Sequence, residues 1–197
     1  MSRNILLVTG VSASGKDFLL ERAKQHDARI GTDIPVVSMG GAIVARMNQQ
    51  VAEGSQVDRD RVKHVVSNDV MRGVVRGIIS DLVEQYPAAI LNGHITYRQQ
   101  GELVSNPDID AEISPAAYAV VVADPKDIAE WRSSDLSRHR EPETLDQIAY
   151  HQEFTVQTAE RMAILLGAHC QIIENNAANT VESSLTLATM VTDICPR

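Results

Sequence analysis

Residues 9–18 read TGVSASGKDF, and this stretch decides how the chain folds. Gly10, Gly15 and Lys16 fit the phosphate-loop pattern GxxxxGK[ST], whose backbone N–H groups surround phosphate oxygens. The stretch follows the apolar run NILLVTG and precedes a helical spacing that begins at Phe18, so it joins a predicted strand to a predicted helix. The motif requires this context, and the alternative is a chance turn rich in Gly and Ser. The residues predicted to hold nucleotide phosphates are Gly10, Val11, Ser12, Ala13, Ser14, Gly15 and Lys16.

Asp17 departs from the pattern, which has Ser or Thr there to offer a hydroxyl to Mg²⁺. Mg²⁺ prefers oxygen ligands and keeps several waters, so Asp17 is a candidate ligand, directly or through a water. Asn92 ends the third predicted strand, where many phosphate-loop proteins have a metal-organising Asp. We therefore expect a swap in which one carboxylate is gained at Asp17 and one is lost at Asn92. The alternative is that Asn92 only hydrogen-bonds a loop.

The rest of the chain alternates strands with helices, a pattern typical of a parallel α/β sheet. Unalternating apolar runs predict strands over 34–38, 88–94, 117–123 and 169–175, in addition to NILLVTG. Helices are expected over 61–85, after Asp124 as N-cap with Pro125 at the first helical position, from TLDQIAY to Gly167, and over 179–194. The fold class is therefore α/β, with a five-stranded parallel sheet flanked by helices.

Composition narrows the function further. With 197 residues and 44% hydrophobic content, residues 1–197 are expected to form a single domain. The net charge of −8 and the 4% aromatic content argue against nucleic-acid binding. No apolar run is long enough to span a membrane, and two cysteines indicate a reducing compartment, so a cytoplasmic location without a membrane partner is expected.

A cluster of arginines follows the fourth predicted strand. Arg132, Arg138 and Arg140 occur within nine positions, among small polar residues that favour a mobile loop. Arginine binds phosphate oxygens in a bidentate way and stays charged, so this segment is predicted to close over the phosphates as a lid. The alternative is a solvated helix face with ordinary surface charges.

From the phosphate loop to about Asn176, the chain resembles adenylate kinases of the archaeal type. The segments that carry the resemblance are VTGVSASGKD, VSMGGAIVARM, DRDRV, NGHITY, WRSSDLSRHRE, TLDQIAYHQ and LLGAHCQIIEN. The GKD loop is also similar to those of phage deoxynucleoside monophosphate kinases and of animal-type phosphomevalonate kinases.

The resemblance implies phosphoryl transfer from ATP·Mg²⁺ to a nucleoside monophosphate, AMP or dAMP favoured, in a P-loop NTPase fold. It implies an acceptor-binding region at about 38–80, a short lid at about 132–142 that supplies catalytic arginines beside Lys16, and an oligomer. The acceptor contacts that it implies are Ser38, Gly40, Gly41 and Arg46, and the residues near the donor adenine are Asn175 and Asn176.

Two further acceptor contacts come from the residues themselves. His94 follows a parallel strand beside the phosphate loop, where open α/β sheets bind ligands, so it is expected to meet a phosphate or the acceptor sugar. Arg72 and Arg76 share one helix face, and either meets the acceptor phosphate or balances Asp69 or Asp81 as a surface charge. Competing functions are another small-molecule kinase, of the phosphomevalonate or dephospho-coenzyme A type, and a non-catalytic ATP-binding module.

Overall fold

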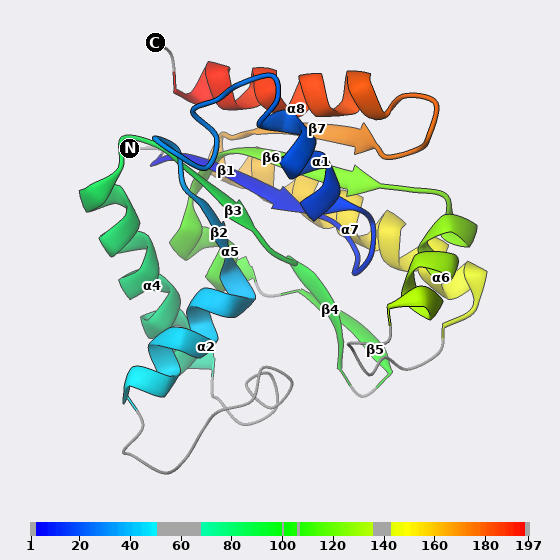
Figure 1. Cartoon of the computed structure of the whole chain (residues 1–197). Helices are drawn as coiled ribbons and strands as arrows, with labels where there is room; N and C mark the ends of the chain where they lie inside the picture. The colour runs from blue at the N-terminus through cyan, green and yellow to red at the C-terminus, as the bar shows by residue number, and fades with distance from the viewer. Residues whose placement is uncertain (1–2, 51–67, 100, 106, 136–142, 196–197) are drawn as a thin grey trace.

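A sheet of five parallel strands forms the centre of the computed structural model (Figure 1). The structure describes residues 3–50, 68–99, 101–105, 107–135 and 143–195. The strands of this sheet are β1 (Arg3–Thr9), β2 (Val36–Ser38), β3 (Ala89–Asn92), β6 (Pro115–Val122) and β7 (His169–Glu174). They lie in the order β2-β3-β1-β6-β7 and all pair in parallel. The predicted sheet is confirmed, and β1 lies in its middle.

Helices pack on both faces of the sheet (Figure 1). They are α1 (Lys16–Ala23), α2 (Met39–Gln50), α4 (Asn68–Gln85), α6 (Pro125–Ser134), α7 (Leu145–Leu166) and α8 (Thr180–Ile194). α1 and α8 pack together on one face, and α4 and α7 cover the other. The helix expected over 61–85 is confirmed from residue 68 onward, and residues 61–67 lie outside the described residues.

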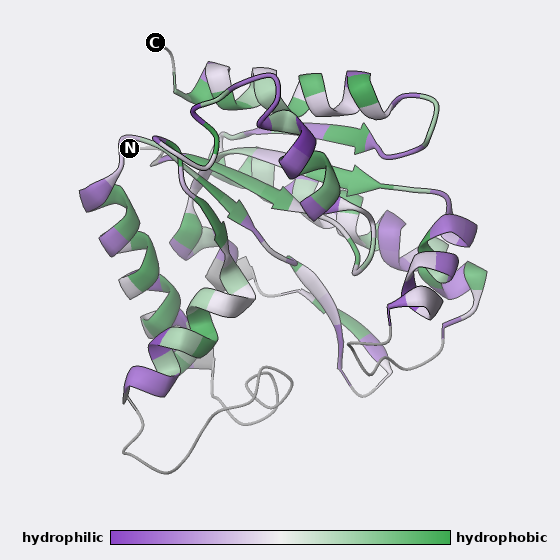
Figure 2. Cartoon of the chain, viewed as in Figure 1, coloured by the Kyte–Doolittle hydropathy of each residue, from purple (hydrophilic) through white to green (hydrophobic). Residues whose placement is uncertain are grey.

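The strand before the phosphate loop is apolar without alternation because both of its faces are covered. Leu6 and Val8 belong to the core shared with α1 and α8, whereas Ile5 and Leu7 belong to the core shared with α4 and α7. All four side chains are at most 1% exposed. Figure 2 shows hydrophobic residues along the central strands, and a mixture of hydrophilic and hydrophobic residues on the helices around them. Burial on both faces fixes the end of β1, from which the phosphate loop starts.

Local capping residues set the helix ends that border the site. The Asp124 side chain accepts a hydrogen bond from the backbone N–H of Lys126, with Pro125 in the first turn of α6, as predicted. Thr144 caps α7 through a capping box with Gln147, and α7 ends before Gly167, whose φ is 65°.

A small antiparallel hairpin follows β3 and was not expected from the sequence. It consists of β4 (Thr96–Gln99) and β5 (Glu102–Ser105), and the short helix α5 (Pro107–Ile113) comes after it. The hydroxyl of Thr96 lies 2.6 Å from that of Thr155 on α7, which ties the start of β4 to the main body. None of the helices in the part of the chain that the structure describes is long and apolar enough to cross a membrane.

Candidate active site

The phosphate loop has a backbone that only small residues allow. Gly10 and Gly15 have φ angles of 148° and 86°, and Ala13 between them also has a positive φ of 65°. A Cβ atom on Gly10 would lie 2.3 Å from the carbonyl oxygen of Val121, and one on Gly15 would lie 1.9 Å from Nδ2 of Asn175. When residues in right-handed and left-handed backbone conformations follow one another, their N–H groups point to one concave side, where an anion can bind. The loop is therefore shaped for phosphate.

Lys16 is folded onto the loop that precedes it. Its Nζ donates hydrogen bonds of 3.0 Å to the carbonyl oxygens of Gly10 and Val11, and the residue is only 7% exposed. These two hydrogen bonds hold the ammonium group against the phosphate loop. The residues predicted for phosphate binding thus lie together around one loop.

Asp17 and Asn92 are in direct contact. The side-chain amide of Asn92 donates a hydrogen bond to Oδ1 of Asp17, from the end of β3 to the first turn of α1. Asn92 pairs in register with Val8 on one side and with Ser38 on the other, so sheet order brings the two side chains together. A carboxylate at position 92 would repel Asp17, whereas an amide orients it. The expected exchange of a carboxylate between the two positions stays a prediction.

His94 lies at the rim of the same loop. Its Nδ1 is 2.7 Å from the carbonyl oxygen of Gly10, which only accepts hydrogen bonds, so Nδ1 carries the proton. Gly10 therefore receives hydrogen bonds from both His94 and Lys16. The contact brings the histidine to the phosphate loop, and its predicted role toward the acceptor stays a prediction.

Asn175 and Asn176 follow β7 at the opposite side of the loop. Asn175 is 4% exposed, and its Nδ2 donates a 3.0 Å hydrogen bond to the carbonyl oxygen of Ser14. Oδ1 of Asn176 accepts hydrogen bonds from the backbone N–H groups of Ala178 and Asn179, which shapes the turn before α8. Asn175 thus holds the phosphate loop through the carbonyl of Ser14. The predicted contact of Asn175 and Asn176 with adenine stays a prediction.

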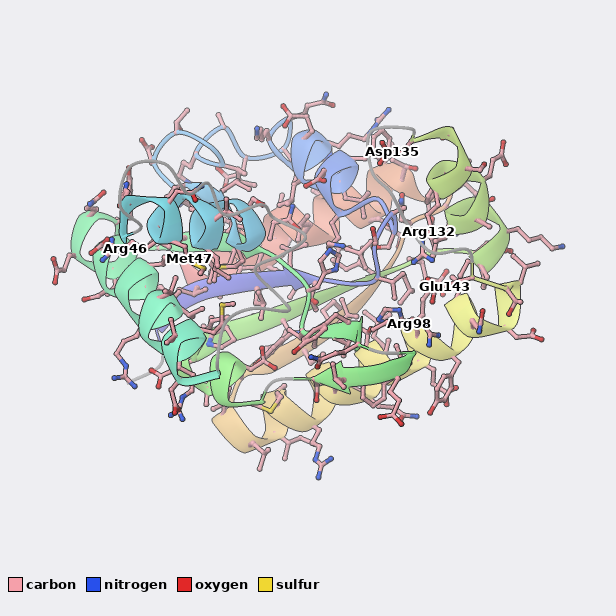
Figure 3. All side chains as sticks on the ribbon, turned by 90° about the horizontal axis from the view of Figure 1, so that it is seen from below. Arg46, Met47, Arg98, Arg132, Asp135 and Glu143 are labelled. Carbon is pink, nitrogen blue, oxygen red and sulfur yellow. The ribbon has the colours of Figure 1, made fainter. Side chains whose placement is uncertain are left out.

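Arg132 reaches the phosphate loop from α6. Its Nε donates a 3.1 Å hydrogen bond to the carbonyl oxygen of Ser12, and its Nη1 donates to Oε2 of Glu143. Glu143 also accepts a 2.5 Å hydrogen bond from Nε of Arg98 on β4. Figure 3 shows Arg98, Arg132 and Glu143 grouped on one side of the molecule. Arg138 and Arg140, the other predicted lid arginines, lie outside the described residues.

The shared carboxylate of Glu143 is ionised in spite of its burial. Burial raises the pKa of Glu143, but the hydrogen bonds and charges of Arg98 and Arg132 outweigh that effect and hold the pKa below its usual value. Sequence reasoning missed both Arg98 and Glu143. Arg98 is four residues beyond His94, but the hairpin that aims it at Glu143 has no clear alternation in the sequence.

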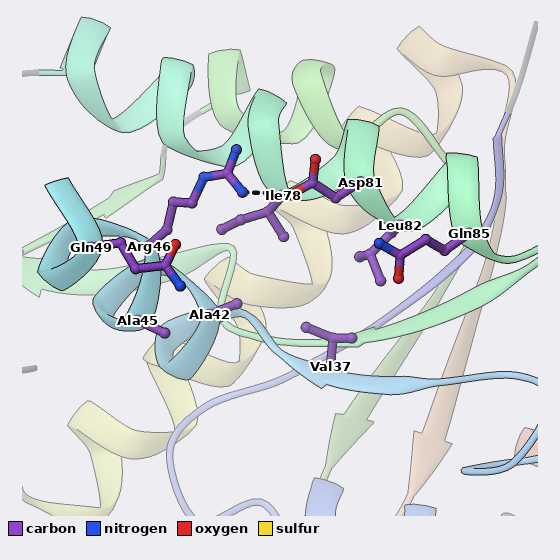
Figure 4. Close-up of a pocket in the computed structure, with 9 residues that line it drawn as sticks. All are labelled: Val37, Ala42, Ala45, Arg46, Gln49, Ile78, Asp81, Leu82 and Gln85. Atoms are coloured by element: carbon purple, nitrogen blue, oxygen red, sulfur yellow. Dashed lines mark hydrogen bonds and ion pairs between the residues drawn. The ribbon is translucent and has the colours of Figure 1, made fainter.

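The predicted acceptor arginines lie away from the loop. Arg46 forms an ion pair of 2.5 Å with Asp81 of α4, beside a groove of about 250 Å³ between α2, α4 and Val37 (Figure 4). Arg72 is paired with Glu112 of α5 at 3.5 Å. Their roles in acceptor binding therefore stay predictions.

The predicted glycine-rich acceptor segment begins α2. The Ser38 hydroxyl accepts a long hydrogen bond of 3.5 Å from the backbone N–H of Gly41, and so lies at the N-terminal end of the helix with Gly40. Ser38 also pairs with Asn92 in the sheet, which brings the start of α2 beside the metal candidate Asp17.

Comparison with known proteins agrees with this geometry. The sequence profile of the AAA-domain family matches residues 9–149. The adenylate kinases of Pyrococcus abyssi and Methanothermobacter thermautotrophicus are each 25% identical to the chain; the alignments cover 96% and 92% of it and 95% of each relative. Among solved structures, a shikimate kinase from Acinetobacter baumannii in complex with shikimate superposes with a TM-score of 0.58 at 9% identity, over 98% of this chain and 95% of that one, which is a likeness of fold. Together with the kinase relatives and the fold, the profile identifies a phosphotransferase of the P-loop kinase fold. Because the profile spans more than half of the 197 residues, the chain belongs to the AAA-domain family.

Proposed function

We propose that the chain transfers the γ-phosphoryl group of ATP to a nucleoside monophosphate, with AMP or dAMP as the favoured acceptor. The observation that supports this most is the preformed loop, in which Lys16 lies over the carbonyls of Gly10 and Val11 while three residues with positive φ turn the backbone inward. The choice of acceptor rests on relatives named adenylate kinase that align along almost the whole chain.

The residues around the loop suit phosphoryl transfer by alignment and charge. Such transfer needs little covalent help from the protein, because stabilisation of charge on the transferring group supplies most of the rate. Lys16 neutralises charge on the β- and γ-phosphates, and Arg132 adds a guanidinium at Ser12, on the neighbouring rim of the loop. An acceptor phosphate oxygen is already ionised at neutral pH, so the reaction needs no general base. His94, at the rim, is a candidate for a contact with the acceptor.

Mg²⁺ is the metal that this site suits. The described residues contain no group of three or more His, Cys, Asp or Glu side chains that could hold an ion by themselves. A site with one carboxylate, Asp17, oriented by the amide of Asn92, fits an ion that keeps several waters and takes its other ligands from phosphates. When bound there, Mg²⁺ would neutralise phosphate charge during the transfer.

The test is a coupled assay of ADP formation with ATP and Mg²⁺. The acceptors are AMP, dAMP, GMP, dGMP, CMP, UMP and dTMP, with phosphomevalonate, dephospho-coenzyme A and a reaction without acceptor as controls. We expect fast turnover with AMP or dAMP and at least tenfold slower turnover with the others. Turnover with phosphomevalonate or dephospho-coenzyme A alone would assign the enzyme to another kinase class. Binding of ATP without turnover for any acceptor would contradict the proposed function.

A further inference from the structure

Glu143 binds two arginines that come from separate parts of the chain. Arg98 is on the hairpin strand β4, and Arg132 is at the end of α6, on the other side of the carboxylate (Figure 3). The three side chains are only 24%, 12% and 13% exposed for Arg98, Arg132 and Glu143, so their charges are weakly screened by water. The group carries two positive charges and one negative charge, which leaves it positive beside the phosphate loop.

The two arginines differ in how their donors are used. All three nitrogens of the Arg98 guanidinium donate to the protein: Nε to Glu143, Nη1 to the carbonyl of Gly101 at 3.0 Å, and Nη2 to the carbonyl of Gln147 at 3.5 Å. Arg132 uses Nε for Ser12 and Nη1 for Glu143. Arg98 is therefore fastened to the body of the protein, whereas Arg132 touches the loop.

The strand that carries Arg98 is itself anchored. The Thr96 hydroxyl lies 2.6 Å from the hydroxyl of Thr155 and 3.3 Å from Nε2 of His151, and all three residues are buried. Burial lowers the pKa of His151, so its imidazole is neutral at pH 7 and adds no third positive charge to the group. Glu143 is thus neutralised by Arg98 from a fixed position.

We propose that Arg98 is a positioning residue that acts through Glu143 and not through contact with the nucleotide. A carboxylate beside a triphosphate repels it, and it also competes with phosphate for Arg132. With Arg98 in place, Glu143 keeps a counterion when Arg132 turns toward a phosphate oxygen. Without Arg98, Arg132 is the remaining guanidinium partner of this mostly buried carboxylate among the residues that the structure describes, and its transfer to phosphate leaves that charge unpaired, which is costly. This inference rests on the proposed function only in requiring that the loop binds ATP.

A double-mutant cycle on nucleotide binding tests the proposal. The variants are Arg98→Gln, Glu143→Gln and the double variant, with Arg161→Gln, an exposed arginine of α7, as the control for loss of one positive charge. The readout is the Kd of a non-hydrolysable ATP analogue with Mg²⁺, measured by calorimetry. We expect Arg98→Gln to weaken binding about tenfold. In the Glu143→Gln background the same change has less than about a twofold effect, because no carboxylate remains to be neutralised.

A purely structural role of Arg98 gives a different result. If Arg98→Gln weakens binding by the same factor with and without the Glu143→Gln change, or has no effect in either background, the proposal is wrong. Arg98→Lys keeps the charge without the planar fork, and we expect a loss of less than about threefold that Glu143→Gln also suppresses. This variant serves the same test if Arg98→Gln does not fold.

The readout also separates this inference from the proposed function. Binding of the analogue needs no acceptor, so the cycle is informative even if no monophosphate is phosphorylated. Turnover with AMP together with an additive cycle would overturn the inference alone. A wild-type protein that does not bind the analogue would overturn both.

Discussion

Two glutamates of this molecule each hold a pair of arginines, and their surroundings differ. Glu143 joins Arg98 and Arg132 beside the phosphate loop, where Arg132 is 12% exposed. Glu112 joins Arg72 and Arg76 between α4 and α5, where Arg76 is 62% exposed. The same three-residue chemistry therefore serves the site in one place and links two helices at the surface in the other. The two clusters differ in the burial of their arginines and in the contact of Arg132 with Ser12. Neither difference can be read from the residue types.

Loss of Arg132 is expected to have the largest effect. Arg132→Gln removes the guanidinium that touches the loop and leaves Glu143 paired with Arg98 alone, so we expect kcat/KM for ATP to fall by about a hundredfold or more. Steady-state kinetics with the preferred acceptor measures this. Arg132→Lys, which keeps the charge, is the matched control and should lose less. Wild-type kinetics in Arg132→Gln would contradict the assignment of the Glu143 cluster to the site.

Substitutions at Asp17 and Asn92, beside the phosphate loop, are expected to have the second largest effect. Asp17→Ser removes the predicted metal ligand, and we expect activity at limiting Mg²⁺ to fall by about tenfold or more. Asn92→Asp in the same protein restores a carboxylate, so partial recovery is expected. Titration of activity against Mg²⁺ for the single and double variants gives the answer. Full activity of Asp17→Ser alone would refute the exchange of carboxylates.

A third carboxylate, two residues before Glu112 on α5, shows what happens without an arginine partner. Asp110 is 3% exposed, its Oδ2 has no hydrogen-bond partner within the described ranges, and burial raises its pKa from 3.8 to about 7. The folded state therefore binds the carboxyl proton of Asp110 more tightly than the unfolded state does. The contribution of Asp110 to stability is highest below about pH 4 and falls as the pH rises from about 4 to 7.

The Asp110→Asn variant makes this a measurable prediction. It removes the ionisation, so the variant gains stability relative to the wild type as the pH is raised from 5 to 8. Urea unfolding at the two pH values measures the difference. An unchanged or reversed difference would show that Asp110 is charged in the folded state. The contribution of Glu112 to stability depends on pH in the opposite direction. The hydrogen bond from Arg76 lowers the pKa of Glu112, so this contribution is present above the ordinary pKa of a glutamate and is lost as the pH falls through the lowered pKa.

Changes at the surface end of the Glu112 cluster are expected to have the smallest effect. Arg76→Gln breaks a pair with a mostly exposed arginine, and such pairs contribute little in water. We expect the melting temperature to change by less than about 2 °C and the kinetics to remain as in the wild type. A loss of activity comparable to that of Arg132→Gln would remove the distinction between the two clusters.

Elements with local sequence signals were predicted well. The central strands β1, β3 and β6 are mostly apolar runs, and the ends of α6 and α7 are marked by Asp124, Pro125 and Gly167. The position of the phosphate loop followed from the strand before it and the helix after it. The contact of Asp17 with Asn92 was within reach as well, because Asn92 ends β3 and Asp17 opens the helix after the phosphate loop of the neighbouring strand β1.

Features that depend on distant partners were not predictable. The hairpin β4–β5 is held by contacts such as Thr96 with Thr155, which are 59 positions apart. The pair Arg98–Glu143 joins residues 45 positions apart, and neither has a motif of its own. The ion pair of Arg46 with Asp81 joins residues 35 positions apart and was likewise not expected. Side-chain direction and long-range pairing depend on the packed structure, and composition or periodicity does not encode them locally.

The most direct test of the account measures phosphoryl transfer from ATP to AMP by the wild-type protein and by Lys16→Met. Lys16 donates to two loop carbonyls in the structure, and its charge is the central element of the proposed chemistry. With Mg²⁺ and both nucleotides present, we expect two ADP to form per turnover in the wild type, and at least a hundredfold slower transfer in a folded Lys16→Met variant. Equal rates in the two proteins would contradict the assignment of this loop as the site of transfer.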